Sequence, residues 1–281
     1  HKKQFKHNKK EYERLSEHIG LYPLVMISPS DIELIWDGSE VRRKFMDSII
    51  SQYDKVYLEK LIAYNHVLQQ RNALLKQFYE SRSFDAMSLE IWDEQLIIHG
   101  EAIIETRKKF LEEFIPLFTR NYHFISGSSE EVSLEYESTL KDRSYKTVLL
   151  TTLDRDRAVH HTTAGPHRDD LDFKLMGNSL KKFASQGQQK SYLLALKLAQ
   201  FEFIKEKKLT KPLLLLDDIY DKLDESRFKK LIELVSGDTY GQVFITDTHP
   251  GRIQELFEQN KSEHIIYVVN NGNIKKHGQE S

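Results

Sequence analysis

Four consecutive leucines that run into two aspartates constrain the fold of this chain more than any other feature. Leu213 to Leu216 follow Pro212 and lead directly into Asp217 and Asp218. A run this apolar predicts a strand buried on both faces, which is typical of a parallel sheet covered by helices. Ligand sites of such sheets lie at the carboxyl ends of the strands, so the two carboxylates emerge where a ligand would bind. The alternative is a strand followed by an ordinary acidic helix cap.

The same alternation of helix and strand continues through the C-terminal part of the chain. We predict a helix from near Ser185, a helix over 228–235, a strand over 242–246, a helix over 253–258 and a last strand over 265–269. Helices that alternate with apolar strands indicate an α/β fold, with a mainly parallel sheet and flanking helices.

Shorter patterns predict further elements outside this region. They are a charged helix over 11–18, a buried strand over 21–27 that ends at 28–30, strands over 132–136 and 148–150, and a hairpin turn at 177–178.

A helical pattern separates the N-terminal strand from these elements. Apolar residues recur at alternating spacings of four and three over 57–78 and, after a polar break, over 89–117. Two such helices joined by a short loop must run antiparallel and cover each other's apolar stripe. Arg71 and His99 interrupt the two seams, so a packed helical hairpin is favoured over a long free coiled coil. The low content of helix breakers, Gly 12 and Pro 6 in 281 residues, is consistent with long helices.

A second motif, Ser185-Gln-Gly-Gln-Gln, opens the helix that precedes the leucine strand. Ser185 and Gln188 fit the Ser-x-x-Gln capping box, and Gly187 lets a ligand approach the backbone closely. A helix N-terminus with exposed amides suits an anionic phosphate, although an ordinary capped helix explains this motif when it is taken alone. Together with the acidic strand end it favours nucleotide chemistry. Asp217 would face a divalent cation that bridges phosphates, and Asp218 would orient or deprotonate a water.

Composition excludes several classes of protein. Lys+Arg 41 against Asp+Glu 43 gives a formal net charge of −2, which argues against a polybasic tail protein. No apolar run approaches the roughly 20 residues of a membrane span, and the start of the chain does not resemble a secretory segment. The absence of cysteine excludes disulfides and fits a reducing compartment. Basic clusters at 2–10, 42–44 and 181–182 have acidic neighbours, so solvated helix faces explain them at least as well as DNA contacts.

These motifs and their order resemble the RecF family of SMC-like ABC ATPases. SQGQQ, LLLLDD and DKLD look like the signature helix, Walker B motif and D-loop of an ABC head, and TTAGPHRDDL, ISPSDIEL, RRKFMD, YNHVLQQRNALLK and IWDEQL match RecF. The resemblance covers essentially the whole chain. It implies an ABC-ATPase-like head with an inserted antiparallel helical arm, divided into a remnant of ATPase lobe I (1–38), the arm (39–125) and a C-terminal ATPase subdomain (126–281).

The resemblance also implies roles for individual residues in nucleotide use. They are Asp217 for Mg²⁺, Asp218 for catalysis, Ser185, Gly187 and Gln188 for the γ-phosphate of ATP held by the other subunit, and Asp221 and Asp224 for a D-loop that crosses the dimer interface.

Other matches to the family are weaker. Thr246-Asp247 stands where many ABC ATPases carry a switch histidine, and His249 lies two residues later. The segment 28–30 stands at the place of the Q-loop without a glutamine. The segment 165–170 is typical of the family but has no assigned chemistry. There, His167 and Arg168 could simply pair with the aspartates that follow them, Asp169 and Asp170.

One family motif does not occur in this sequence. No Gly-x-x-x-x-Gly-Lys-Ser/Thr is present, and Gly187-Gln-Gln-Lys-Ser191 lacks the spacing to wrap phosphates. In RecF this Walker A loop lies in an N-terminal lobe that would precede His1. We therefore expect this chain to bind ATP poorly and not to hydrolyse it alone.

The resemblance implies a cytoplasmic ATP- and Mg²⁺-dependent homodimer that clamps DNA, both duplex and single-strand/duplex junctions, and has no membrane association. It would act with RecO and RecR to help load RecA at gaps, in recombinational repair, replication-fork maintenance and the SOS response. One alternative is a non-catalytic module of an SMC-like head that contacts DNA or protein. Another is a different SMC-like ATPase, which predicts a longer coiled-coil arm than residues 39–125 provide.

Overall fold

The computed structural model describes residues 5–218, 225–248 and 264–276. Contacts group the chain into two compact units. Unit 1 comprises His1–Tyr22, Glu33–Thr119 and Glu130–Ala184, and unit 2 comprises Pro23–Ile32, Arg120–Ser129 and Ser185–Ser281. These units cut the chain at other places than the three segments expected from the sequence. The division into lobe I, arm and C-terminal subdomain that the sequence implies stays a prediction.

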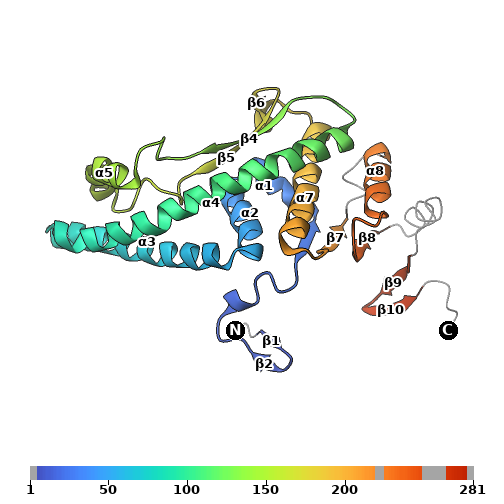
Figure 1. Cartoon of the computed structure of the whole chain (residues 1–281), viewed down its shortest axis with the longest axis horizontal. Helices are drawn as coiled ribbons and strands as arrows, with labels where there is room; N and C mark the ends of the chain where they lie inside the picture. The colour runs from blue at the N-terminus through green and yellow to red at the C-terminus, as the bar shows by residue number, and fades with distance from the viewer. Residues whose placement is uncertain (1–4, 219–224, 249–263, 277–281) are drawn as a thin grey trace. The chain divides into compact units, whose positions relative to one another are not determined.

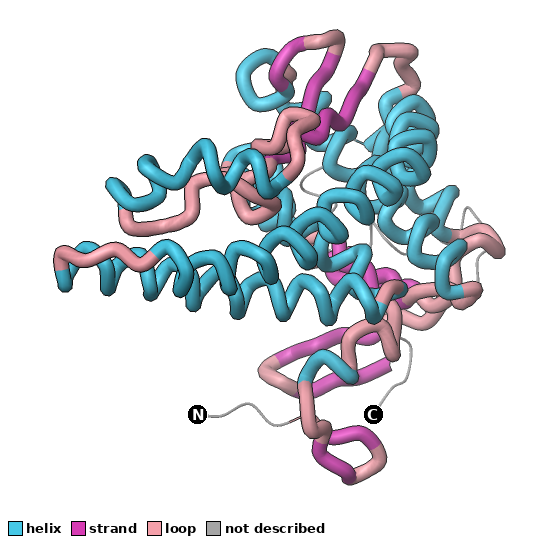
Figure 2. The backbone as a smooth tube through the Cα atoms, turned by 60° about the vertical axis from the view of Figure 1, so that its left-hand side comes forward, coloured by secondary structure: helices cyan, strands magenta, loops and turns pink. Residues whose placement is uncertain are grey.

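Unit 1 is built around a helical hairpin. Its helices are α1 (Glu33–Trp36), α2 (Ser39–Tyr53), α3 (Lys55–Ser81), α4 (Ala86–Ser126, whose last residues belong to unit 2), α5 (Tyr145–Val159) and α6 (Leu180–Phe183). The long helices α3 and α4 lie side by side (Figures 1 and 2), as the two apolar seams predict. Asp54 caps α3 by accepting a hydrogen bond from the Tyr57 amide at 2.9 Å. Because α5 also packs against α3, the arm is a packed hairpin and not a free coiled coil.

A small antiparallel sheet completes unit 1. It contains β4 (Val132–Glu137), β5 (Asp170–Leu175) and β6 (Asn178–Ser179), in that order. Leu171, Phe173 and Leu175 alternate inward along β5, which packs against α2. The predicted hairpin turn is confirmed, because Met176 and Gly177 both adopt positive φ (49° and 72°) between β5 and β6.

Two predictions for unit 1 are wrong. The segment 11–18 is not a helix: a hairpin of β1 (Lys6–His7) and β2 (Lys10–Glu11) is followed only by a 3₁₀ turn, η1 (Leu15–Glu17). There the rings of Tyr12 and His18 pack together, which favours a compact turn over a solvated helix. The segment 148–150 is not a strand but lies inside α5, where the Ser144 hydroxyl caps the helix through the Thr147 amide. An apolar run this short does not by itself distinguish a strand from a buried helical face.

Unit 2 contains the predicted parallel sheet. Its strands are β3 (Leu24–Ile27), β7 (Leu213–Asp217) and β8 (Val243–Thr246), with β7 in the centre and all three parallel. The helices are α7 (Gln186–Lys208), which packs on β3, and α8 (Glu225–Val235), and a short 3₁₀ helix, η2 (Pro29–Ile32), follows β3. Residues 191–201 of α7 are all buried, as expected for a helix at the centre of a core.

The C-terminal end of unit 2 differs from the prediction. The last predicted strand, 265–269, does not join the parallel sheet. Instead, β9 (Tyr267–Asn270) pairs antiparallel with β10 (Asn273–Lys276). Asn271 and Gly272 connect them with positive φ, and an Asn-Gly pair between two strands is typical of such a hairpin. The predicted helix over 253–258 lies outside the described residues. Among the residues that are described, no helix is long and apolar enough to span a bilayer.

Candidate nucleotide-binding site

The aspartate pair lies at the carboxyl end of the central strand of unit 2, as predicted. Asp217 is the last residue of β7, and Asp218 leaves the strand with φ of 49°. Thr246, which faces Asp217 in the register of β7 and β8, holds both residues. Its hydroxyl donates a hydrogen bond to Oδ1 of Asp217 at 2.5 Å. The amide of Asp218 donates to the carbonyl and hydroxyl oxygens of Thr246, each at 3.3 Å. One side chain of the neighbouring strand therefore fixes the first carboxylate and the backbone of the second.

This arrangement fits a cation that is shared with a phosphate ligand. Within the described ranges, no group of three or more His, Cys, Asp or Glu side chains could hold a metal alone. Mg²⁺ is commonly bound through one or two carboxylates plus substrate phosphates, with waters completing its coordination. Asp217 is half-buried, and only one of its carboxylate oxygens is bonded to Thr246. Its other oxygen can serve as the protein ligand in such a set.

The Ser185-Gln-Gly-Gln-Gln motif forms the capped helix start that the sequence predicts. The amide of Gln188 donates to the Ser185 hydroxyl at 3.2 Å, and the amide of Ser185 donates to the Gln188 side chain at 2.8 Å. Ser185 is exposed although the body of α7 is buried. Its hydroxyl oxygen accepts within the cap, so its hydrogen can still be donated to an anion at the helix N-terminus.

Arg227 of α8 also contacts this helix start, and sequence reasoning missed it. Its Nε donates to the Ser191 hydroxyl at 2.7 Å, and that hydroxyl donates to the Gly187 carbonyl at 3.1 Å. A Cβ atom on Gly187 would lie 3.3 Å from Arg227 Nη1, so the glycine gives the guanidinium room to lie over the first turn. The first turn of α7 is thereby tied to the helix that follows the aspartate pair. The only signal in the sequence was an arginine three residues after Asp224.

The remaining family positions of unit 2 are less complete. Asp221, Asp224 and His249 lie outside the described residues, so the D-loop assignment stays a prediction. Asp31 directly follows 28–30, the segment proposed as a Q-loop. Its carboxylate accepts a hydrogen bond from the Ser28 amide at 2.8 Å and forms an ion pair with Lys197 at 3.0 Å. These contacts attach the segment after β3 to α7, which gives it a structural role.

The family motif at 162–170 is a clasp within unit 1. Gly165 has φ of 128°, and a Cβ there would lie 2.1 Å from the Tyr145 hydroxyl, so only glycine fits. The Asp169 carboxylate accepts from the Tyr136 hydroxyl at 2.5 Å and the Thr139 amide at 2.8 Å. The neighbouring Asp170 is held by both Nε and Nη2 of Arg42 (2.8 and 2.9 Å). The suggested pairing of His167 and Arg168 with these aspartates is therefore wrong. His167 bonds the Tyr64 hydroxyl instead, and Arg168 is exposed.

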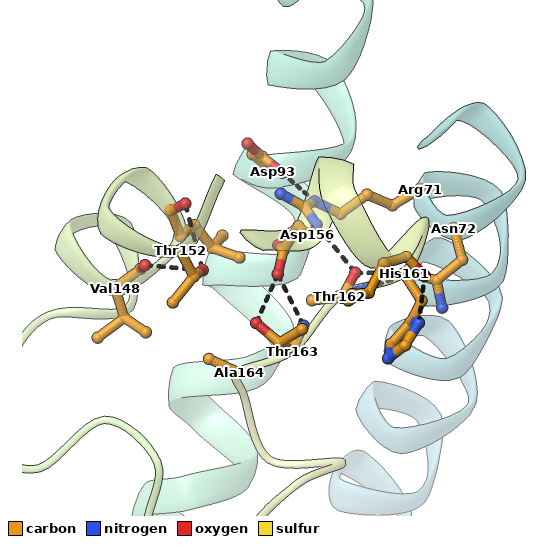
Figure 3. A network of polar contacts seen from close by, with 12 residues as sticks. Arg71, Asn72, Asp93, Val148, Thr152, Asp156, His161, Thr162, Thr163 and Ala164 are labelled. Carbon is orange, nitrogen blue, oxygen red and sulfur yellow. Dashed lines mark hydrogen bonds and ion pairs between the residues drawn. The ribbon is translucent and has the colours of Figure 1, made fainter. Parts of the chain in front are cut away.

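The same motif also contacts the arginine that interrupts the helical seam, which two carboxylates of α4 and α5 neutralise (Figure 3). Arg71 is fully buried and donates to Asp156 at 2.7 Å, to Asp93 at 2.5 Å and to the Thr162 hydroxyl at 2.9 Å. Burial opposes the charge of Arg71, but the adjacent carboxylates raise its pKa above the usual value. Asp156 in turn accepts from the amide and hydroxyl of Thr163. Arg71 thus joins α3, α4, α5 and the clasp, and is a structural residue.

Comparisons with known proteins agree with this architecture. No protein-family model matches the chain. The DNA replication and repair protein RecF of Flavobacterium johnsoniae is 53% identical over 270 residues, covering 96% of this chain and 74% of that protein. RecF of Bacteroides thetaiotaomicron is 48% identical over 279 residues, covering 99% and 75%.

Solved structures give the same result. A structure of the recombination mediator protein RecF-ATP in the RecFOR pathway matches with a TM-score of 0.84 and 29% identity, over 97% of this chain and 72% of that one. A second, of RecF-ATPrS, matches with a TM-score of 0.83 over 96% and 72%. The predicted α/β fold, an ABC-ATPase-like head with a helical arm, is confirmed. The chain belongs to the RecF family of DNA replication and repair proteins.

Proposed function

We propose that this chain is part of the DNA-binding, ATP-hydrolysing head of a RecF-type recombination mediator. Because it has no Walker A motif, it does not hydrolyse ATP alone. Two such heads would close on ATP, hold duplex DNA or a single-strand/duplex junction near a gap, and act with RecO and RecR to help load RecA. Relatives described as bound to ATP and as part of the RecFOR pathway support the nucleotide and the partners. We place this activity in the cytoplasm, in recombinational repair, replication-fork maintenance and the SOS response.

The observation that carries the proposal is the aspartate pair that Thr246 fixes at the carboxyl ends of the parallel strands. Water would attack the γ-phosphorus of ATP, the bond to the β-phosphate would break and ADP would leave, while Mg²⁺ would neutralise charge on the phosphate oxygens. Asp217 would bind the cation, and Asp218 would accept the proton of the attacking water. The exposed first turn of α7, with Ser185 at its start, would meet the γ-phosphate of the nucleotide held by the other head.

The proton-accepting role of Asp218 can be tested directly. In the complete protein, Asp218→Asn should slow ATP hydrolysis by roughly 10²–10⁴-fold, the range for loss of a general base, and should prolong ATP-dependent dimers. The control is Asp238→Asn, an exposed aspartate of the same unit, which should behave as wild type. Hydrolysis that is unchanged in Asp218→Asn would disprove the catalytic assignment. DNA binding that is equally strong with and without ATP would favour the alternative, a non-catalytic interaction module.

A further inference from the structure

A cavity of about 260 Å³ in unit 1 has no role in the nucleotide chemistry described above. It lies where α2, α3 and α4 meet the clasp, and two sequence motifs typical of the family line it. Arg43 and Lys44 come from RRKFMD on α2, and His167 comes from the clasp. Arg107 of α4 lies at its wall, together with two carboxylates, Glu40 and Asp47.

The more buried of these carboxylates is already neutralised. Asp47 accepts three hydrogen bonds from Arg107, at 2.9 to 3.0 Å, and one from the Tyr57 hydroxyl at 2.5 Å. Arg107 is 2% exposed and its remaining guanidinium nitrogen donates to the Pro166 carbonyl. The two charges therefore cancel inside the wall, and neither is free to bind a ligand.

The second carboxylate is held only weakly. Glu40 pairs with Lys44 one helical turn away at 2.7 Å, and both side chains are largely exposed (69% and 74%). Exposed pairs at this spacing contribute little to stability, so an incoming anion can replace Glu40 beside Lys44.

Arg43 provides a cation at the cavity that no carboxylate neutralises by direct contact within the described part of the chain. Its Nη1 donates to two uncharged oxygens, the Ser39 hydroxyl and the Asp169 carbonyl, both at 2.7 Å. Burial and then the charge of Arg107 lower the pKa of Arg43. The charges of Asp170, Asp47 and Glu40 oppose this shift, but none of these carboxylates contacts the guanidinium of Arg43 directly.

The charges that act on His167, at the same cavity, are also positive. Burial, followed by the positive charges of Arg168, Arg43 and Arg71, lowers the pKa of His167 to about 4, against one opposing hydrogen bond to the Thr162 carbonyl. Arg168 is exposed next to it in the chain. The cavity thus combines a neutral histidine with an excess of positive charge, which suits an anion.

We propose that this cavity binds a phosphate group of the nucleic-acid backbone, with Arg43 and Lys44 as its ligands. The proposal rests on the proposed function and names a contact point for the DNA. A planar guanidinium matches the oxygens of a phosphate, and a flexible ammonium adds a point charge. Tyr64, the tyrosine that lines the cavity, is 1% exposed, so it offers no open face on which a base could stack. The contact between this cavity and the DNA would therefore not depend on the base sequence of the DNA.

The test measures the affinity of the complete protein for duplex DNA, with ATP present, over a range of salt concentrations. Lys44→Gln and Arg43→Gln should each weaken binding and reduce the slope of log affinity against log salt by about one, the contribution of one phosphate contact. Lys76→Gln is the matched control, because Lys76 is similarly exposed (70%) and pairs with Glu80 at the same spacing. It should leave both affinity and slope unchanged.

Each other result overturns the proposal in a distinct way. If wild type binds DNA and both variants keep its salt slope, the cavity is not a contact point although the proposed function stands. If the variants lose affinity for ATP measured without DNA, and not for DNA, the phosphate belongs to a free nucleotide. If wild type binds no DNA at any salt concentration, the proposed function fails as well. Lys44 is exposed, so its variant stays informative even if Arg43→Gln does not fold.

Discussion

The buried ion pair between Arg71 and Asp156 gives the sharpest prediction about stability. Both side chains have 0% relative exposure and lie 2.7 Å apart. Asp156→Asn keeps the shape of the side chain and removes its charge. Removing one partner of a buried pair costs about 3–5 kcal/mol, because the other charge is left uncompensated. Asp93 still contacts Arg71 at 2.5 Å and is 22% exposed. We therefore expect the lower end of that range, a free energy of unfolding reduced by about 3 kcal/mol.

Urea denaturation followed by circular dichroism measures this change, and hydrogen exchange of α3 and α5 amides localises it. Asp154→Asn is the control. Asp154 lies two residues away on the same helix, is fully exposed and is 3.9 Å from Arg157, so its variant should unfold at the wild-type urea concentration. The double variant Arg71→Met with Asp156→Asn should lose less than the sum of the single variants, because both buried charges are gone. A loss below about 1 kcal/mol for Asp156→Asn would refute the reasoning.

Three further predictions concern the clasp and the aspartate pair. Gly165→Ala should lower the free energy of unfolding by more than about 3 kcal/mol in denaturation experiments, because the new methyl group overlaps the Tyr145 hydroxyl and φ is 128°; a smaller loss would show that the clasp can relax. Thr246→Val should lower the factor by which Mg²⁺ raises the affinity for ATP roughly tenfold, because Asp217 loses the hydrogen bond that positions it. Calorimetric titrations of the complete protein measure this factor, and the free energy of unfolding should not change. A factor equal to that of wild type would exclude a positioning role for Thr246. Burial lowers the pKa of His167 to about 4, so as pH falls the unfolded chain binds the proton before the folded protein does. The free energy of unfolding should therefore fall by up to about 3 kcal/mol between pH 6.5 and pH 4. Stability measured against pH should fall less steeply in His167→Gln, and equal slopes would contradict this assignment.

Local signals in the sequence predicted the elements that carry the candidate site. The capping box of Ser185 and Gln188 involves residues three apart, and the leucine strand is defined by its own apolar run. The arm helices follow a spacing that repeats over many residues, so their existence was also predictable. By contrast, the run at 148–150 was too short to identify its own conformation, and its helix is set by a cap at Ser144.

The contacts that fix the site and the helical arm depend on residues that are distant in the chain. Thr246 reaches Asp217 because β7 and β8 are adjacent in a particular register, which no local pattern encodes. Arg71 was identified as an interruption of the seam, but its partner Asp156 is 85 residues away. Arg227 likewise bonds Ser191 across 36 residues. In each case the side chain acquires its role from the packing of two elements that are distant in the sequence.

The burial of α7 determines how its exposed start can take part in any movement. From Ser191 to Phe201 every residue of this helix is enclosed by the protein, whereas Ser185 meets solvent. Close-packed interiors resist the sliding of a single element, because each displaced side chain would leave a void or an overlap. The first turn of α7 is therefore held rigidly by the buried part of the helix and does not behave as a flexible loop. A ligand that binds at this helix start must therefore approach by rigid-body movement and not by a local rearrangement of α7. Substitutions in the buried part of α7 should change ligand affinity by changing the orientation of the helix.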